Sequence, residues 1–162
     1  SDAHLASLLE AARWAASCFN AQPWHLVVAR RDREPVAHAA ICACLSGNNQ
    51  AWAPQAPVLM VSVARLDFAH NGRPNRHAAY DTGAAMAQMA IQATAIGLQI
   101  HQMGGFDLDK ARGALGIPEG YEPRAAIALG HPGPASALPE ELAQRETAAR
   151  QRRPVAEWVH YG

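Results

Sequence analysis

The chain has 162 residues, with 14 basic and 14 acidic side chains and a formal net charge of zero at pH 7. This length favours one domain with its own core, so we expect residues 1–162 to form a single domain. The balanced charge argues against the basic surface that nucleic-acid binding requires. The 3 cysteines indicate no disulfide framework and the first residues are not a signal peptide, which predicts a cytoplasmic protein.

The first predicted helix ends at a compact polar turn. Leucine and alanine recur at three- and four-residue steps over residues 2–16, and Asp2 or Ser1 is placed to cap the first turn. Residues 17–24 then have the sequence Ser-Cys-Phe-Asn-Ala-Gln-Pro-Trp. Hydroxyl and amide groups can form hydrogen bonds here, and Pro23 disfavours helix at Gln22. This segment alone is compatible with an ordinary loop or with a stiff corner suited to a flat, heteroatom-rich ligand.

A strand, a helix and a second polar loop follow. Residues 25–29 are short, apolar and partly β-branched, as in a buried strand. Residues 34–45 return to helical spacing, with Pro35 in the first turn and Gly47 just beyond the end. Residues 48–57 are rich in side-chain amides and contain two prolines. We expect them to form an irregular contact loop.

The middle of the chain combines a predicted central strand with an unusually apolar helix. Residues 58–64 are almost continuously apolar and lack Gly and Pro, and residues 66–76 contain a turn signal at Asn71-Gly72. Residues 77–97 are mostly small and apolar. A transmembrane span is one interpretation, but Asp81, Gln88 and Gln92 would be costly in a bilayer. We expect a helix buried all round, either in the core or between two subunits.

The last part of the chain alternates strands and helices again. Residues 98–103 predict a strand that runs into Gly104-Gly105, where the main chain can approach a ligand. Asp107 is a predicted N-cap of a helix that ends near Gly116, and residues 117–123 form a predicted turn. Residues 124–129 predict a strand, and residues 139–150 a solvated helix before a basic tail. The interleaving predicts an α+β fold with helices packed over a small sheet.

Other interpretations of single residues are weaker. Cys42 and Cys44, with His38, lack the usual zinc spacing, and the two sulfurs of C-x-C on a helix point apart, so we expect core cysteines and no metal. A nucleophilic role for Cys18 would need a base, and the sequence indicates none, so we favour a packing thiol. The basic tail, as an alternative to a binding role, is a solvated end of the chain.

Four separated segments together resemble the nitroreductase family of FMN enzymes. The first, Ala16-Ser17-Cys18-Phe19-Asn20-Ala21-Gln22-Pro23-Trp24, is similar to the family's Pro-Ser-x-x-Asn-x-Gln-Pro-Trp. The others are Gly47-Asn48-Asn49-Gln50-Ala51-Trp52 before an Ala-Pro, His101-Gln102-Met103-Gly104-Gly105-Phe106-Asp107, and the arginines at positions 150, 152 and 153. The likeness covers nearly the whole chain.

This resemblance implies a homodimer with helices over a mainly antiparallel sheet and FMN at the subunit interface. It implies an FMN-dependent oxidoreductase that passes electrons from NADH or NADPH, by a ping-pong mechanism, to nitroaromatic, quinone or similar flat acceptors. Neither nucleic acid nor a membrane is an expected partner. The alternative is a non-catalytic flavin-binding protein or a degenerate dimeric scaffold of the same fold.

The resemblance also carries over individual residues. The first motif would lie against the flavin, Asn49 would read its pyrimidine edge, and Gly104 with Gly105 would pass near its reactive N5. An arginine pair would bind the phosphate bidentately. The chemistry is centred on the flavin, with His101 as a candidate proton source, although a histidine at a strand end more often has a structural role. The predicted cofactor contacts are Ser17, Cys18, Asn20, Gln22, Asn49, Met103, Gly104, Gly105, Arg150 and Arg152.

The chain departs from the family pattern at several points. Ala16 and Cys18 stand where many members have Pro and Ser, and Trp52 stands where some have a lysine near the flavin carbonyl. The family's Arg-Ser-x-Arg-type segment before the first helix, which contributes phosphate and ring contacts, has no counterpart. We therefore expect the N-terminal phosphate-binding segment to be absent from this chain.

Overall fold

The computed structural model describes all of residues 1–162 in two compact parts, Ser1–Pro132 and Gly133–Gly162, which we describe separately. The first part has five α-helices and four strands. Its helices are α1 (Asp2–Arg13), α2 (Pro35–Cys44), α3 (Gly47–Gln50), α4 (Ala78–Ala95) and α5 (Leu108–Ala114). Its strands are β1 (Trp24–Arg30), β2 (Val58–Arg65), β3 (Gln99–Met103) and β4 (Tyr121–Gly130).

The four strands form one antiparallel sheet in the order β1-β2-β4-β3. The two apolar strands β2 and β4 lie in the centre, and β1 and β3 are the edges. The polar turn of residues 17–24 leads into β1, whereas Gly104 directly follows β3. The two motifs with the most specific family resemblance therefore start from opposite edges of the sheet.

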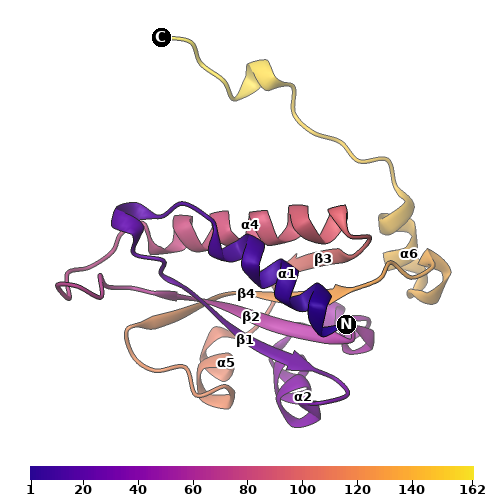
Figure 1. Cartoon of the computed structure of the whole chain (residues 1–162). Helices are drawn as coiled ribbons and strands as arrows, with labels where there is room; N and C mark the ends of the chain where they lie inside the picture. The colour runs from indigo at the N-terminus through magenta and orange to yellow at the C-terminus, as the bar shows by residue number, and fades with distance from the viewer. The chain divides into compact units, whose positions relative to one another are not determined.

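Helices cover both faces of this sheet. Figure 1 shows α1 and α4 on one face, and α2 and α5 on the other. Alternate residues of β2 supply the two cores because successive side chains of a strand point to opposite faces. Met60 packs with Leu8 of α1 and Met89 of α4, whereas Leu59 packs with Ile41 of α2. This arrangement confirms the predicted α+β architecture with helices over a small antiparallel sheet.

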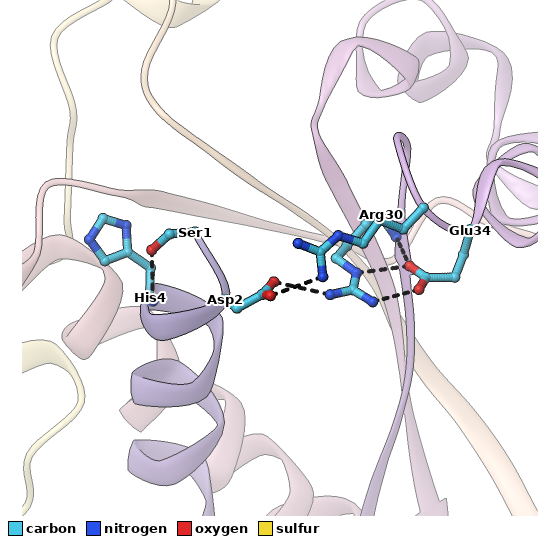
Figure 2. Close-up of polar contacts among 6 residues, drawn as sticks. Ser1, Asp2, His4, Arg30 and Glu34 are labelled. Atoms are coloured by element: carbon cyan, nitrogen blue, oxygen red, sulfur yellow. Dashed lines mark hydrogen bonds and ion pairs between the residues drawn. The ribbon is translucent and has the colours of Figure 1, made fainter.

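The start of α1 is tied to the turn between β1 and α2, as Figure 2 shows. The Ser1 hydroxyl accepts a hydrogen bond from the His4 N–H at 3.3 Å, so Ser1 is the N-cap. The Asp2 carboxylate is then free to pair with Arg30 at 3.1 Å and with Arg33 at 2.9 Å. Arg30 also pairs with Glu34 at 2.6 Å. Four charged side chains thus join two elements that are far apart in the sequence.

Several boundaries differ from the sequence prediction. The helix expected over residues 2–16 ends at Arg13, and Gly47, expected to stop α2, begins α3 instead. The loop expected over residues 48–57 contains the end of α3 and a 3₁₀ turn, η2 (Ala53–Gln55). Strand β4 begins at Tyr121, within the expected turn, because Pro123 lies opposite Val63 beside a bulge of the ladder, where a missing N–H is tolerated.

The apolar helix α4 is not buried all round within the chain. One of its faces packs on the sheet through Ala85, Met86 and Met89. Its opposite face leaves Tyr80 and Ile91 at 79% and 72% exposure. No helix of the protein combines the length and hydropathy that a membrane span requires.

The second part, Gly133–Gly162, contains helix α6 (Glu140–Thr147) and two 3₁₀ turns, η3 (Ala135–Ala137) and η4 (Val155–Glu157). Helix α6 has no buried residue, so the predicted solvated helix is confirmed with a shorter span. Arg150 and Arg152 follow α6 and are exposed. The side chain of Arg152 donates only to the neighbouring Gln151 carbonyl, at 2.8 Å. The organisation of residues 1–162 as a single domain stays a prediction.

Candidate functional site

The turn before β1 is a corner held by side chains from inside and outside it. The Gln22 N–H donates to the Ser17 hydroxyl at 3.0 Å, and the Gln22 amide donates to Asn20 Oδ1 at 3.2 Å. The Cys18 N–H donates to the Asp81 carboxylate at 2.9 Å. Asp81 lies in the first turn of α4 and is only 4% exposed, a position where the helix dipole favours a negative charge. The corner is thereby attached to the start of α4.

This corner is also strained. Three of its residues have positive backbone φ angles: 52° at Phe19, 54° at Asn20 and 45° at Gln22. Residues other than glycine rarely adopt such angles. Each such residue costs on the order of 1–3 kcal/mol and persists only where its surroundings hold it in place, most often at ligand-binding sites. The strain and the hydrogen bonds agree with the stiff corner proposed from the sequence, rather than with an ordinary loop.

A second group of predicted residues meets at the opposite edge of the sheet. Asn49, on α3, donates its side-chain N–H to the Gly105 carbonyl at 2.9 Å, and the Ser46 N–H donates to the same oxygen at 2.9 Å. A Cβ on Gly105 would lie 2.7 Å from Ser46 Oγ and 2.9 Å from Asn49 Nδ2. A side chain at this position would therefore push Asn49 away, and glycine is what allows the contact.

This group leaves hydrogen-bonding atoms open. The bond to Gly105 fixes the Asn49 amide so that its Oδ1 faces no donor of the chain, and the N–H groups of Gly104 and Gly105 have no partner in the chain. Both glycines are exposed. One acceptor on α3 and two donors that follow β3 are thus available in this group. We call Ser46, Asn49, Gly104 and Gly105 the glycine wall.

Trp52 and His101 form an aromatic pair close to this wall. Their ring centroids lie 4.9 Å apart with the planes at 74°, an edge-to-face contact. His101 is exposed on β3, two residues before Met103. Met103 itself is 3% exposed and packs in the core, so only its main chain is available to a ligand.

The chain alone does not bring all the predicted residues together. Ser17, Cys18, Asn20 and Gln22 lie before β1, whereas the glycine wall lies after β3, at the other edge of the sheet. Arg150 and Arg152 belong to the second compact part. The sequence interpretation missed Asp81 as the support of the corner. An isolated acidic residue in the first turn of an otherwise apolar helix was the signal that could have identified it.

Two cavities of the first part can be compared with the positions of these residues. A cavity of about 260 Å³ adjoins the corner and is lined by Phe19, Phe68, His70, Asn71, Arg73 and Pro74. The larger one, about 540 Å³, lies between α2 and the end of α5, lined by Val27, Val36, Ala40 and Leu115 among others. The larger cavity contains none of the predicted cofactor contacts. Cavity volume alone therefore does not identify the candidate site in this chain.

Proteins of known structure share this fold. An oxidoreductase containing FMN, of known crystal structure, is 36% identical, covers 100% of this chain and 82% of its own, and superposes with a TM-score of 0.93. A putative nitroreductase in complex with FMN from Desulfovibrio desulfuricans is 25% identical, with 100% and 85% covered and a TM-score of 0.74.

Two proteins are related to this chain by sequence. An NADH dehydrogenase from Thermus thermophilus is 32% identical, in an alignment that covers 79% of this chain and 75% of that protein. An uncharacterized 15.4 kDa protein from Mycolicibacterium smegmatis is 40% identical over 106 residues, 65% of this chain and 69% of that protein. The model of the Nitroreductase family matches residues 1–131, which include the corner and the glycine wall. The chain belongs to the nitroreductase family.

Proposed function

We propose that this protein is an FMN-dependent oxidoreductase that takes electrons from NADH or NADPH. Its family, the FMN in two similar solved structures and the NADH dehydrogenase among its relatives support this activity. The observation that carries the proposal is the glycine wall, where Asn49 and two free N–H groups stand together at an exposed strand end. The wall lies within the part of the chain that matches the family.

The residues of the chain fit this cofactor chemically. The pyrimidine edge of the isoalloxazine has one N–H donor between two carbonyl acceptors, and the wall has one open acceptor, Asn49 Oδ1, beside two open donors. The missing Cβ at Gly105 keeps this edge free. From the corner, Ser17, Cys18, Asn20 and Gln22 would contact the ring, and Arg150 with Arg152 would bind the phosphate.

The proposed protein is a homodimer with a site at each end of its interface. The exposed face of α4 is a stripe of small and apolar residues, Tyr80, Ala84, Ala87 and Ile91, at helical spacing. Such a face suits a second copy of the same helix, because its small residues allow close approach. The corner is hydrogen-bonded to the start of α4, so it lies beside this interface. One subunit would then supply the corner and its partner the glycine wall.

In the proposed reaction the residues of the chain would orient and shield the flavin ring, and the chemistry would belong to the cofactor. Bound FMN would supply a carrier that accepts and returns two electrons. The corner and the wall would hold the ring so that reductant and acceptor use the same exposed face in turn, which is the structural requirement of a ping-pong mechanism. A quinone acceptor takes up two electrons and two protons and leaves as a hydroquinone. His101, which is exposed on β3, would hold one of these protons at a ring nitrogen. Nitroaromatic and other flat acceptors fit the same open site.

The test uses the full chain purified with added FMN. A flavin absorption band is expected, and anaerobic NADH or NADPH should bleach it. Asn49→Ala removes the open acceptor and should weaken FMN binding about tenfold, the equivalent of about 1.4 kcal/mol. Asn48→Ala, the exposed neighbour with no side-chain hydrogen bond in the chain, is the control. No flavin band in any condition would contradict the proposal, and a band that neither nucleotide bleaches would leave only a flavin carrier.

A further inference from the structure

The cavity beside the corner has a composition that the proposed flavin contacts do not explain. Its walls come from two separate segments: Phe19 belongs to the corner, and the other lining residues belong to the loop between β2 and α4. Phe19 stands between Cys18 and Asn20, both predicted flavin contacts. A molecule in this cavity would therefore lie next to the proposed cofactor position.

The cavity offers aromatic surface to a flat ligand. Phe19 is 84% exposed, which is unusual for a side chain of this type. Its ring meets Phe68 edge to face, with centroids 5.9 Å apart, and Phe68 meets His70 at 5.6 Å. The positive φ of Phe19 keeps this ring in its exposed position at a conformational cost. Rings arranged in this way can receive another ring on a free face or edge.

The cavity also offers an open positive charge. The Arg73 guanidinium makes no hydrogen bond and no ion pair within the chain, and none of the lining residues is acidic. The nearest acid in sequence, Asp67, is paired with Arg65 at 2.6 Å. An arginine without a partner beside apolar rings is suited to an anionic group such as a carboxylate.

The loop that carries Arg73 is already ordered by its own hydrogen bonds. The Phe68 N–H donates to the Arg73 carbonyl at 2.8 Å, and the Arg73 N–H donates to Asn71 Oδ1 at 2.9 Å. Gly72 turns the chain with a φ of 67°. Binding of a ligand would therefore not carry the entropic cost of ordering this part of the cavity.

We propose that this cavity selects the electron acceptor and favours a single flat ring that carries an anionic group. At about 260 Å³, it is smaller than the roughly 300–1,000 Å³ of sites for drug-sized ligands, so it suits one substituted ring and not a dinucleotide. The proposal deepens the proposed function and depends on it, because only a flavin enzyme has an acceptor to select. Arg73 would bind the anionic group, and Phe19 and Phe68 would flank the ring.

The test is steady-state kinetics of the flavin-loaded protein with para-nitrobenzoate and with uncharged para-nitrobenzyl alcohol. The wild type should prefer the carboxylate. Arg73→Gln should raise the KM for para-nitrobenzoate about tenfold, the typical value of one charge-assisted hydrogen bond, with little change in kcat and none in the KM for the alcohol. Phe19→Ala should raise the KM for both acceptors. Arg76→Gln, an exposed arginine of the same loop that does not line the cavity, should change neither.

Flavin content and bleaching by NADH, measured on each variant, separate this inference from the proposed function. If the protein binds flavin and is bleached, but Arg73→Gln has the same acceptor preference as the wild type, the inference alone is overturned. An increase in the KM for NADPH relative to NADH in Arg73→Gln, with the acceptor ratio unchanged, would assign Arg73 to a nucleotide phosphate and would also overturn it. A protein that binds no flavin would overturn both proposals.

Discussion

At the scale of single residues, the tightest requirement lies at Gly105. Its carbonyl accepts two hydrogen bonds, from Asn49 and from Ser46, and the side chains of those same residues occupy the space that a Cβ would need. Close packing and the orientation of Asn49 are therefore one constraint. This constraint applies to Gly105 alone, because a Cβ at Gly104 would meet open space. A single sequence does not show which of the two neighbouring glycines is constrained.

We expect Gly105→Ala to displace the Asn49 amide. The loss of about one net hydrogen bond should destabilise the protein by about 1 kcal/mol, measured from the urea midpoint, and FMN affinity should fall as in Asn49→Ala. Gly113→Ala, in α5 where an added Cβ meets nothing within 4 Å, is the control, and it should be neutral or slightly stabilising because alanine is the better helix former. Equal behaviour of the two variants would show that the space at Gly105 is not limiting.

At the scale of elements, the ion pairs of Figure 2 join α1 to the turn between β1 and α2. The Arg30 guanidinium, with added help from the Arg30 N–H, lowers the pKa of Glu34 from its usual 4.5 to about 2. Hydrogen bonding to Arg33 likewise lowers the pKa of Asp2. A carboxyl with a lowered pKa in the folded state stabilises the fold at neutral pH, and this contribution is lost as the group is protonated.

The sign of this effect sets a pH-dependent test. The contribution of Glu34 is fully present above pH 4.5 and declines as the pH falls toward about 2. We expect Glu34→Gln to lower the thermal midpoint at pH 7 and to make the midpoint fall less steeply over that acid range. Glu119→Gln, whose exposed carboxylate makes no ion pair, should retain the wild-type slope. Parallel curves for Glu34→Gln and the wild type would show that the ion pair is not coupled to folding.

The sequence predicted the elements better than their arrangement. Every strand and every helix longer than a single turn has a counterpart in the expected pattern, because burial on a sheet or beside it leaves a clear apolar periodicity. The sequence did not predict that β4 extends through Pro123. A proline normally indicates the end of a strand, and the bulge beside Val63 that accommodates it is visible only in the structure. The sequence left open whether α4 is buried in the core or between two subunits, because alanine is compatible with both burial and exposure within one chain.

The candidate site was predictable only in parts. Asn49 and Gly105 were identified by resemblance to family motifs, and the structure brings them together across 56 positions of sequence. The bond from Cys18 to Asp81 spans 63 positions, and no local pattern encodes such a pair. The cavity of Phe19 and Arg73 likewise depends on how two loops meet. Long-range pairing of this kind follows from the strand order, which periodicity does not specify.

At the scale of the whole molecule, the apolar stripe of α4 makes a prediction about assembly. We expect the protein to be a dimer in sedimentation velocity, and Ile91→Glu to give monomers, because a buried unpaired charge is costly at an interface. Val36→Glu is the matched control: Val36 is 83% exposed on α2, which lies on the other face of the sheet (Figure 1), and its substitution should leave the dimer intact. A wild-type monomer at micromolar concentration would contradict the proposed interface.

The position of the two motifs at opposite edges of the sheet has a genetic consequence for such a dimer. In the proposed dimer each chain would contribute a corner to one site and a glycine wall to the other, so a single defective allele would damage both sites of its homodimer. Two different alleles, one defective in the corner and the other in the wall, behave differently when they are expressed together. In the mixed dimer both defects fall in the same site, and the second site is assembled from an intact corner and an intact wall. Two inactive alleles can therefore complement each other within one molecule.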